Sequence, residues 1–448
     1  MMTRRDLTVQ IAPLTAALLF VLALGVASQV AAQVTSEEAG MARFIDEHTE
    51  ATIELLERLV NINSGTLNLE GVREVGQILG DEFAAIGFNT RWLEMPEDVG
   101  RAGHLYAERT GESGQRLLLI GHLDTVFESD DSFQTFTREG SIGRGPGTDD
   151  MKGGGVVMLL ALQALASVGA LDDVTIRIVM TGDEERPGAP LSLVRRDLIE
   201  AAGESDIALG FEGGISDEQG DWGTIARRSA SGWKLAVEGT QAHSSQIFSE
   251  SVGAGAIFEV SRILSEFYDE VRGEEYLTFN AGMIVGGTEV SYDEATAGGA
   301  AFGKTNVVPQ SAIVAGGIRT ISPEQLTRAQ EAMRDVVARH LPHTAAEIEF
   351  DEGYPPMAPT EGNRALLTLY NQGSEDLGLG TLRELDPSRR GGADISFVAD
   401  RLDALAGMGS IGSGAHSPSE QVDLSSIPVQ AKRAAVMIYR LTRSRPVS

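Results

Sequence analysis

The chain has 448 residues, enough for two or three domains that each bury a core. Lys and Arg total 36 against 65 Asp and Glu, a formal net charge of −29, and a negative field of this kind repels nucleic-acid phosphates, so we expect no nucleic-acid partner. The chain has 0 Cys, which excludes thiolate chemistry and lipid-modified cysteines, so any metal site must be built from His, Asp and Glu.

Residues 1–32 have the pattern of a secretory signal sequence. Arg4 and Arg5 precede an apolar run at about residues 14–27, and "VAA" offers a cleavage site after Ala32. That run is short for a membrane span, which needs about 20 apolar residues. We therefore expect a periplasmic or secreted protein without a stable membrane anchor. An uncleaved N-terminal anchor is the alternative.

Strand-like apolar runs alternate with segments of helical period through residues 33–230. This alternation favours an α/β fold with a mainly parallel mixed sheet flanked by helices, in which ligands bind at the carboxyl ends of the strands. The predicted helices cover residues 37–61, 69–86, 153–168 and 191–202, and the predicted strands cover residues 116–124, 174–181 and 205–212.

A different order of elements begins near Ser231. Strand, helix, two strands, helix and strand follow one another, and this βαββαβ order is that of an α+β, ferredoxin-like sandwich. We predict that residues 231–347 form a small domain inserted into a larger one. The larger domain then consists of residues 33–230 and 348–448.

Gly298–Thr305, "GGAAFGKT", satisfies the phosphate-loop pattern G-x-x-x-x-G-K-[ST]. That loop binds phosphate through the free N–H groups of a helix that opens at the Lys. Here "NVVP" follows, and two β-branched residues with Pro309 do not open a helix. We interpret the match as a coincidence. Nucleotide binding is the rival hypothesis, and a nucleotide titration tests it.

Five short segments outside the inserted region carry groups that bind metal or transfer protons. In "GHLDTV", His122 and Asp124 stand two apart at the end of a predicted strand, so both side chains fall on one face. Asp124 can then hold the imidazole with its other nitrogen free for a metal. The other segments contain Asp149 and Asp150 in a glycine-rich loop, the triplet Asp183–Glu185, Glu212 in "GFEGG" and His416 in "GSGAHSPSE".

Each of these residues alone has a structural explanation, such as a helix N-cap for a loop Asp. Together they fall where an α/β sheet places its site, and they suit two metal ions about 3.5–4 Å apart. Zinc accepts such ligands, and cobalt or manganese also suit them. Of Glu184 and Glu185, we expect one to bind metal and the other to transfer a proton, while Asp183 caps the turn.

Taken in order, the motifs resemble the co-catalytic zinc peptidases and deacylases, a family that includes glutamate carboxypeptidase, acetylornithine deacetylase and succinyl-diaminopimelate desuccinylase. The resemblance covers nearly the whole chain after the signal sequence. It implies two zinc ions per subunit, with Glu184 as general base and Asp124 in the catalytic group. The implied metal ligands are His122 and Glu212 on the first metal, Glu185 and His416 on the second, and Asp150 as the bridge.

Asp150 is preferred to Asp149 because the family's bridging acid stands two residues before the Lys of D-x-K-G-G, here Lys152. The family often has a cis peptide after this acid, which implies a cis bond at Asp150–Met151. After Glu185 the chain departs from the family, with "RPG" in place of the common "xGS".

The inserted region resembles the dimerisation or lid domain of the family, which implies a homodimer. "GTQAHSS" matches its G-x-x-A-H segment, so His243 is implied to stabilise the oxyanion, either within its own chain or across a dimer. "KTNVVP" and "GGIRT" imply that Asn306 and Arg319 hold a substrate carboxylate. After His243 the chain departs from the family, with "SSQIFSES" in place of small residues and a Pro. Outside this region, "GGADISF" matches a substrate loop at Gly391 and Gly392.

The expected reaction is hydrolysis of an amide or peptide bond next to a free carboxylate, as in a glutamate carboxypeptidase. An N-acyl-amino-acid deacylase or a dipeptidase would use the same site, and the sequence does not separate them. The non-enzymatic alternative is an exported protein that binds a small ligand. Such a protein has no need of a free acid beside five metal ligands.

Overall fold

The computed structural model describes residues 34–294 and 296–444. The predicted signal sequence, residues 1–32, lies outside the described residues. Among the helices of the described ranges, none is long and apolar enough to cross a membrane.

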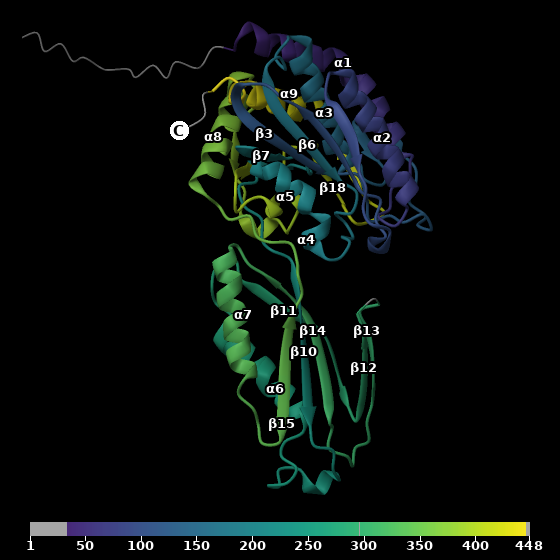
Figure 1. Ribbon diagram of the computed structural model, residues 1–448, viewed down its shortest axis with the longest axis vertical. Coiled ribbons are helices and arrows are strands. Elements are labelled where there is room, and N and C mark those ends of the chain that lie inside the picture. Colours follow the sequence, from purple (N-terminus) through teal and green to yellow (C-terminus); the bar gives the residue numbers. More distant parts are fainter. Residues whose placement is uncertain (1–33, 295, 445–448) are drawn as a thin grey trace, which may run out of the picture. The chain divides into compact units, whose positions relative to one another are not determined.

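The larger domain is built on a six-stranded sheet with the order β1-β2-β6-β3-β7-β17 (Figure 1). β6, β3, β7 and β17 are parallel, whereas β2 is antiparallel to both β1 and β6. The predicted mainly parallel mixed sheet is therefore confirmed. The strands are β1 (Asn89–Leu93), β2 (His104–Arg109), β3 (Ser113–His122), β6 (Val174–Thr181), β7 (Ile207–Gly210) and β17 (Asp403–Leu405).

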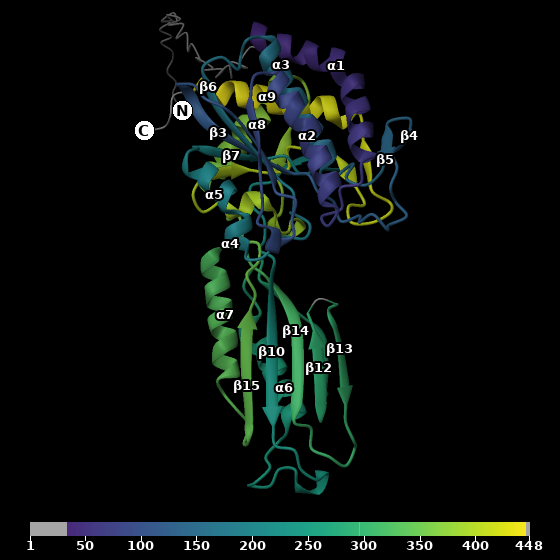
Figure 2. The same ribbon diagram turned by 45° about the vertical axis from the view of Figure 1, so that its right-hand side comes forward.

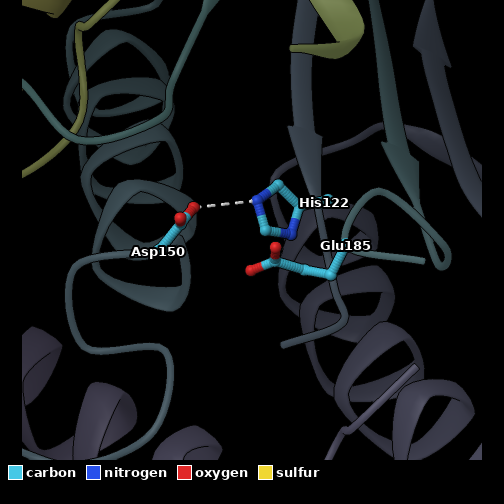
Figure 3. A group of neighbouring side chains, drawn as sticks. All are labelled: His122, Asp150 and Glu185. Carbon is cyan, nitrogen blue, oxygen red and sulfur yellow. Dashed lines mark hydrogen bonds and ion pairs between the residues drawn. The ribbon is translucent and has the colours of Figure 1, made fainter. Parts of the chain in front are cut away.

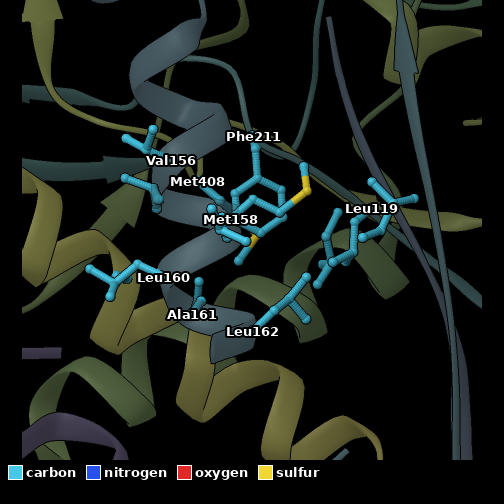
Figure 4. Close-up of a cluster of buried hydrophobic side chains, with 14 of the residues drawn as sticks. Leu119, Val156, Met158, Leu160, Ala161, Leu162, Phe211 and Met408 are labelled. Atoms are coloured by element: carbon cyan, nitrogen blue, oxygen red, sulfur yellow. The ribbon is translucent and has the colours of Figure 1, made fainter. Parts of the chain in front are cut away.

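Apolar side chains cover both faces of this sheet because successive residues of a strand point to opposite sides. In β3, Leu117 and Leu119 join one core and Leu118 and Ile120 join the other. Figure 4 shows part of the first core, where Leu119 lies beside side chains of α3. A strand buried on both faces reads as a continuous apolar run, which is why β3 and β6 were predictable.

The helices that build the first core include α1 (Ser36–Val60), α2 (Leu69–Ala85), α3 (Lys152–Ser167) and α9 (Ser426–Leu441). α3 contacts both α1 and α9, and it is buried along nearly its whole length. α8 (Glu361–Asp376) packs on α9, and the second core contains α5 (Arg196–Gly203) and η5 (Asp394–Phe397) (Figure 2).

The single helix predicted at residues 191–202 is wrong in detail, because α4 (Leu191–Val194) and α5 are separate helices. They are separated at Arg195, whose backbone leaves the helical conformation at φ −108° and ψ 4°. The side chain of Arg195 is fully buried in ion pairs with Asp183 and Asp394. Asp183 and Asp394 lie outside the helical segment. Its own sequence pattern therefore does not show the interruption.

The inserted region forms a four-stranded antiparallel sheet with the order β11-β14-β10-β15. Its strands are β10 (Ser231–Gly239), β11 (Thr278–Gly287), β14 (Ser311–Arg319) and β15 (Thr344–Phe350). α6 (Ala256–Glu266) and α7 (Pro323–Val337) share one core with β10 and β14. The predicted βαββαβ order is present, and β15 runs past the predicted boundary at residue 347.

A hairpin of β12 (Glu289–Asp293) and β13 (Gly298–Phe302) was not predicted. It contains most of the phosphate-loop match: "GGAAF" is an antiparallel strand, and turn residues follow Lys304. The backbone there does not open a helix at the Lys, so coincidence is the correct interpretation. Small side chains give β13 a weak apolar pattern, which explains the omission.

Two smaller sheets complete the larger domain, with the orders β16-β9-β8 and β18-β19-β5-β4. Their strands are β4 (Thr137–Glu139), β5 (Ile142–Arg144), β8 (Ile215–Asp217), β9 (Gly220–Gly223), β16 (Leu382–Glu384), β18 (Gly412–Ser413) and β19 (Gln421–Asp423).

Candidate active site

The acids and histidines singled out in the sequence gather at the carboxyl ends of β3, β6 and β7. These strands are adjacent and parallel, so the chain leaves all three at one edge of the sheet. A cavity of about 190 Å³ lies among the side chains there. Its lining residues include Asp149, Asp150, Glu184, Glu185, Glu212 and His416.

His122, Asp150 and Glu185 form the tightest group, with one candidate ligand atom from each lying within 4.8 Å of the others (Figure 3). Nε2 of His122 lies 3.1 Å from Oδ1 of Asp150. Nε2 of His416 lies 3.3 Å from Oδ2 of Asp150 and 3.1 Å from Oε2 of Glu185. The two imidazoles therefore approach different oxygens of one carboxylate, an arrangement that suits a carboxylate between two cations.

The chemistry of these groups fits a divalent metal. Imidazole nitrogens and carboxylate oxygens are the ligands that zinc accepts in catalytic sites. Within the described residues, Oε1 of Glu185 is buried without a hydrogen-bond partner. A buried oxygen of this kind is costly unless something binds it, and a cation would do so.

Asp124 ties His122 to the turn that carries the two glutamates. Nδ1 of His122 lies 3.1 Å from the backbone oxygen of Asp124 and 3.5 Å from its Oδ1. The Asp124 carboxylate accepts hydrogen bonds from the Thr66 hydroxyl at 2.6 Å and from the backbone N–H groups of Glu184 and Glu185 at 3.0 and 3.1 Å. This leaves Nε2 of His122 directed to Asp150, as a metal ligand requires.

Glu212 lines the cavity but is engaged by a cation of the chain itself. Nη2 of Arg227 lies 2.6 Å from Oε2 of Glu212, and both side chains are largely buried. Nε of Arg227 donates to the Gly391 carbonyl at 2.8 Å. The sequence did not single out Arg227, because its partner Glu212 lies in a different segment, just after β7.

Asp183 has a structural role. Its Oδ2 accepts a hydrogen bond from the Gly188 N–H at 2.8 Å, so the prediction that it caps the turn is confirmed. Its Oδ1 lies 2.6 Å from Nη1 of Arg195, and Nε of Arg195 lies 2.7 Å from Oδ1 of Asp394. A buried arginine between two aspartates thus makes the first of the three adjacent acids tolerable beside a strand end.

Arg195 also reaches the backbone of Glu184 through a tyrosine. Nη2 of Arg195 donates to the Tyr354 hydroxyl at 2.8 Å, and that hydroxyl donates to the Glu184 carbonyl at 2.7 Å. Tyr354 belongs to the segment that returns from the inserted region and pairs with Ala230. The position of Glu184 is therefore fixed from two sides, by Asp124 and by Tyr354.

Arg195→Leu is expected to destabilise the fold by about 3–5 kcal/mol, because it leaves the carboxylates of Asp183 and Asp394 buried without their counterion. Urea unfolding followed by circular dichroism measures the change. Arg196→Leu is the matched control, since that side chain is 52% exposed and its loss is expected to stay within about 0.5 kcal/mol. Equal stability of the two variants would contradict the structural role of Arg195.

The crowding of buried acids changes their protonation. Burial raises the pKa of Glu185 to about 7. Burial likewise raises the pKa of Glu184 well above its ordinary value, and Glu212 adds to this, although positive charge on His122 acts in the other direction. Hydrogen bonds to Asp150 and Glu185 raise the pKa of His416 to about 10. Carboxylates that raise one another's pKa in this way gain from a bound cation.

The residues implied for the inserted domain fall into two separate places. His243 and Asn306 are exposed neighbours, joined by a hydrogen bond from the Ser244 N–H to the Asn306 carbonyl at 2.9 Å. Arg319 ends β14, and Asn306 precedes the start of that strand. A strand rises about 3.4 Å per residue, so roughly 27 Å of β14 separates them. Within one chain, Asn306 and Arg319 do not meet.

The sequence model of the peptidase family M20/M25/M40 matches residues 118–440. The chain belongs to this family. The match includes the strand that ends at His122, the acids after β6 and β7, and His416. The predicted family is therefore confirmed.

Two curated relatives from bacteria align with most of the chain. Carboxypeptidase G2 of Pseudomonas sp. (strain RS-16) is 28% identical over 402 residues, covering 87% of this chain and 89% of that protein. Succinyl-diaminopimelate desuccinylase of Bordetella avium (strain 197N) is 25% identical over 370 residues, covering 79% of this chain and 90% of that protein.

Solved structures of low sequence identity share the fold. An M20 family metallo-carboxypeptidase from Sulfolobus solfataricus has a TM-score of 0.63 at 16% identity, covering 88% of this chain and 99% of that one. A tripeptidase from Staphylococcus aureus has a TM-score of 0.64 at 18% identity, with coverage of 88% and 99%. They support the α/β fold with its inserted α+β domain.

Membership of the M20/M25/M40 family makes this chain a metal-dependent hydrolase of the metallopeptidase class, as predicted. The alternative of a ligand-binding protein without chemistry is thereby set aside. The predicted bond at Asp150–Met151 is cis, which confirms that detail of the resemblance.

Glu420 is a site residue that the sequence did not reveal. It is 1% exposed, and its carboxylate accepts backbone N–H groups of Gly147, Asp149 and Asp150 at 3.2, 2.9 and 3.0 Å. Glu420 thus shapes the loop that presents Asp150. In sequence it is a polar residue in a serine-rich loop after His416, which is typical of a surface position.

Proposed function

We propose that this enzyme hydrolyses an amide or peptide bond next to a free carboxylate, in the manner of a glutamate carboxypeptidase, with two zinc ions per chain. The observation that carries the proposal is the Asp150 carboxylate, whose two oxygens face His122 and His416 while Glu184 lines the same cavity. The relatives named carboxypeptidase G2 and succinyl-diaminopimelate desuccinylase support this class of reaction.

The proposed ligands are His122 and Glu212 for one metal and His416 and Glu185 for the other, with Asp150 shared. Arg227 contacts Oε2 of Glu212, so the second oxygen of that carboxylate is the one proposed to bind. Zinc held by such ligands lowers the pKa of water from 15.7 toward about 7. Cobalt or manganese would suit the same ligands.

Glu184 is the proposed proton carrier. It takes a proton from water during attack on the carbonyl and delivers it to the leaving nitrogen. Burial raises the pKa of Glu184 well above its ordinary value, which favours the protonated form that delivers the proton to the leaving nitrogen. Asp124 and Tyr354 hold its backbone while it does so.

We infer that the enzyme works as a homodimer formed through the inserted domain. His243 and Asn306 lie at the opposite end of β14 from Arg319, so a second chain is the proposed source of His243 and Asn306 at each site, stabilising the oxyanion and the substrate carboxylate. Phe248 and Phe258 support an interface on this domain, since their rings pack 5.4 Å apart although they are 66% and 52% exposed. Light scattering should give twice the chain mass, whereas a fully active monomer contradicts the inference.

Export is a separate proposal that rests on residues 1–32. Cleavage after Ala32 would give a mature chain that begins at Gln33 in the periplasm or medium. N-terminal sequencing of the protein recovered from those fractions tests this, and a cytoplasmic protein that retains Arg4 and Arg5 contradicts it.

The function is tested by supplying the purified protein with zinc and three substrate sets: peptides with a C-terminal glutamate, dipeptides and N-acyl amino acids. Each substrate is paired with its C-terminal amide, which lacks the free carboxylate. Hydrolysis of the acids but not of the amides is the expected result. Equal hydrolysis of both members of a pair, or of neither, contradicts the proposal.

A further inference from the structure

The cavity beside the metal ligands also contains an arginine that neither the mechanism nor the family resemblance uses. Arg390 lines it together with Asp149, Glu212 and Gly213. It follows the short turn η4 (Pro387–Arg389) and immediately precedes the Gly391–Gly392 loop. Arg390 therefore borders the cavity in which the proposed substrate binds.

Arg390 has hydrogen-bonding capacity that the protein leaves unused. Within the described residues, its guanidinium donates from Nη2 to the Gly213 carbonyl, and its Nε is buried with no partner. Arginine has five N–H donors. The neighbouring Arg227 is different, because it binds the Glu212 carboxylate at 2.6 Å and the Gly391 carbonyl at 2.8 Å. The protein thus supplies partners for the guanidinium of Arg227 but leaves donors of Arg390 without partners among the described residues.

The charge of Arg390 persists at neutral pH. Burial, and to a lesser extent the positive charge of Arg227, lower the pKa of Arg390 to about 10, while Glu212 and Asp149 act in the other direction. Glu212 is already paired with Arg227, and among the described residues no carboxylate lies within ion-pair distance of Arg390. A buried positive group of this kind is costly unless an anion pairs with it.

A second guanidinium lies on the other side of the same loop. A Cβ atom placed on Gly391 would be 3.0 Å from Nη1 of Arg319, the residue proposed to hold the free carboxylate of the substrate. Gly391 and Gly392 thus separate two arginines, of which Arg390 alone lines the cavity. The cavity of about 190 Å³ is smaller than the 300–1,000 Å³ typical of sites for drug-sized ligands, so the group that enters it is small.

We propose that Arg390 binds a second carboxylate of the substrate, and that the preferred substrates are amides of an acidic amino acid, glutamate or aspartate. This rests on the proposed function, in which Arg319 holds the first carboxylate. Arginine is suited to this role because its planar fork pairs with both oxygens of a carboxylate. The second carboxylate comes from the released amino acid in this proposal, and a carboxylate on the acyl side is the alternative that the experiment separates.

The test compares kcat/KM of the zinc-loaded full chain on matched substrates. N-benzoyl-glutamate and N-benzoyl-glutamine differ only in the side-chain charge of the released residue, whereas N-succinyl-leucine and N-acetyl-leucine differ in the charge of the acyl group. The wild-type enzyme is expected to prefer glutamate to glutamine by about 10- to 100-fold, the effect of a hydrogen bond to a charged group. Arg390→Gln is expected to bring that ratio near one, mainly through KM, with little change on glutamine.

Arg389→Gln is the matched control, because that neighbouring side chain is 40% exposed and paired with Asp217; it is expected to keep the wild-type ratio. Arg390→Lys retains the charge without the fork and is expected to keep part of the preference. This variant also serves if Arg390→Gln does not fold, which thermal melting shows.

Three results overturn the proposal. Arg390→Gln that keeps the wild-type ratio shows that Arg390 does not read the second carboxylate. A uniform loss of kcat/KM on all substrates, together with a changed zinc content, shows that Arg390 instead offsets the negative charge of the cavity carboxylates. A preference for N-succinyl-leucine over N-acetyl-leucine, with none for glutamate over glutamine, places the second carboxylate on the acyl group. This contradicts the proposal that the released amino acid is acidic.

A wild-type enzyme that cleaves none of these substrates contradicts the proposed function but still leaves Arg390 testable. Calorimetry then compares binding of free glutamate and free glutamine to the zinc-loaded protein. Tighter binding of glutamate that is lost in Arg390→Gln supports the inference, and equal binding of the two amino acids overturns it.

Discussion

Glu184→Gln is expected to lower kcat by about 10²- to 10⁴-fold while the bound metal stays at the wild-type level. The amide has nearly the shape of the carboxyl group but cannot carry the proton that general acid–base catalysis moves. Glu184 is not among the proposed ligands, and its backbone is fixed by Asp124 and Tyr354, so the fold and the metal site are expected to persist. Steady-state kinetics and metal analysis on the same preparation measure both properties.

Glu218→Gln is a suitable control, since Glu218 is an exposed acid in the turn between β8 and β9; its kinetics are expected to match the wild type. Retained turnover in Glu184→Gln would remove Glu184 from the mechanism. Loss of metal together with turnover would make Glu184 a ligand and return the proton-transfer role to Glu185.

Asp150→Asn is expected to remove most of the bound metal and to lower kcat/KM by at least about 10³-fold. His122 and His416 approach different oxygens of Asp150, and an amide supplies a single oxygen, without charge. Because both metal ions are proposed to share Asp150, its replacement is expected to weaken the binding of each ion. Zinc titration followed by calorimetry, with kinetics at saturating zinc, measures the two effects.

Asp149→Asn is the matched control, because the two aspartates are neighbours and the choice between them rested on the distance to Lys152. Asp149 lines the cavity, and its Oδ1 is buried without a partner in the described part of the chain, yet neither histidine forms an ion pair with it there. It is expected to keep the metal. The reverse result, with metal lost in Asp149→Asn and kept in Asp150→Asn, would reassign the bridging role.

The parts of the site that the sequence predicted are those that follow a strand. β3 and β6 are apolar on both faces, so their ends were visible as the points where polar residues begin at His122 and Asp183. The carboxyl ends of parallel neighbours share an edge of the sheet, and this predicts that Glu185 and Glu212 lie near His122.

The parts that were missed depend on partners distant in the chain. The carboxylate of Glu420 holds the loop of Asp150 by accepting backbone N–H groups, and backbone donors leave no trace in a sequence. Arg195 lies at the break between α4 and α5 and pairs with Asp394, which is far away in the chain. Arg227 and Tyr354 gain their roles from the pairing of the two segments that join the domains, which no local pattern predicts.

The most direct test of the proposed dinuclear centre is the number of metal ions in the purified full chain after zinc has been supplied and the excess removed. Mass spectrometry with plasma ionisation counts zinc against protein, and native mass spectrometry counts ions on each intact chain. Two zinc ions per chain is the expected result. A chain that remains without zinc, or that binds it without gaining any hydrolytic activity, would contradict the assignment of this site.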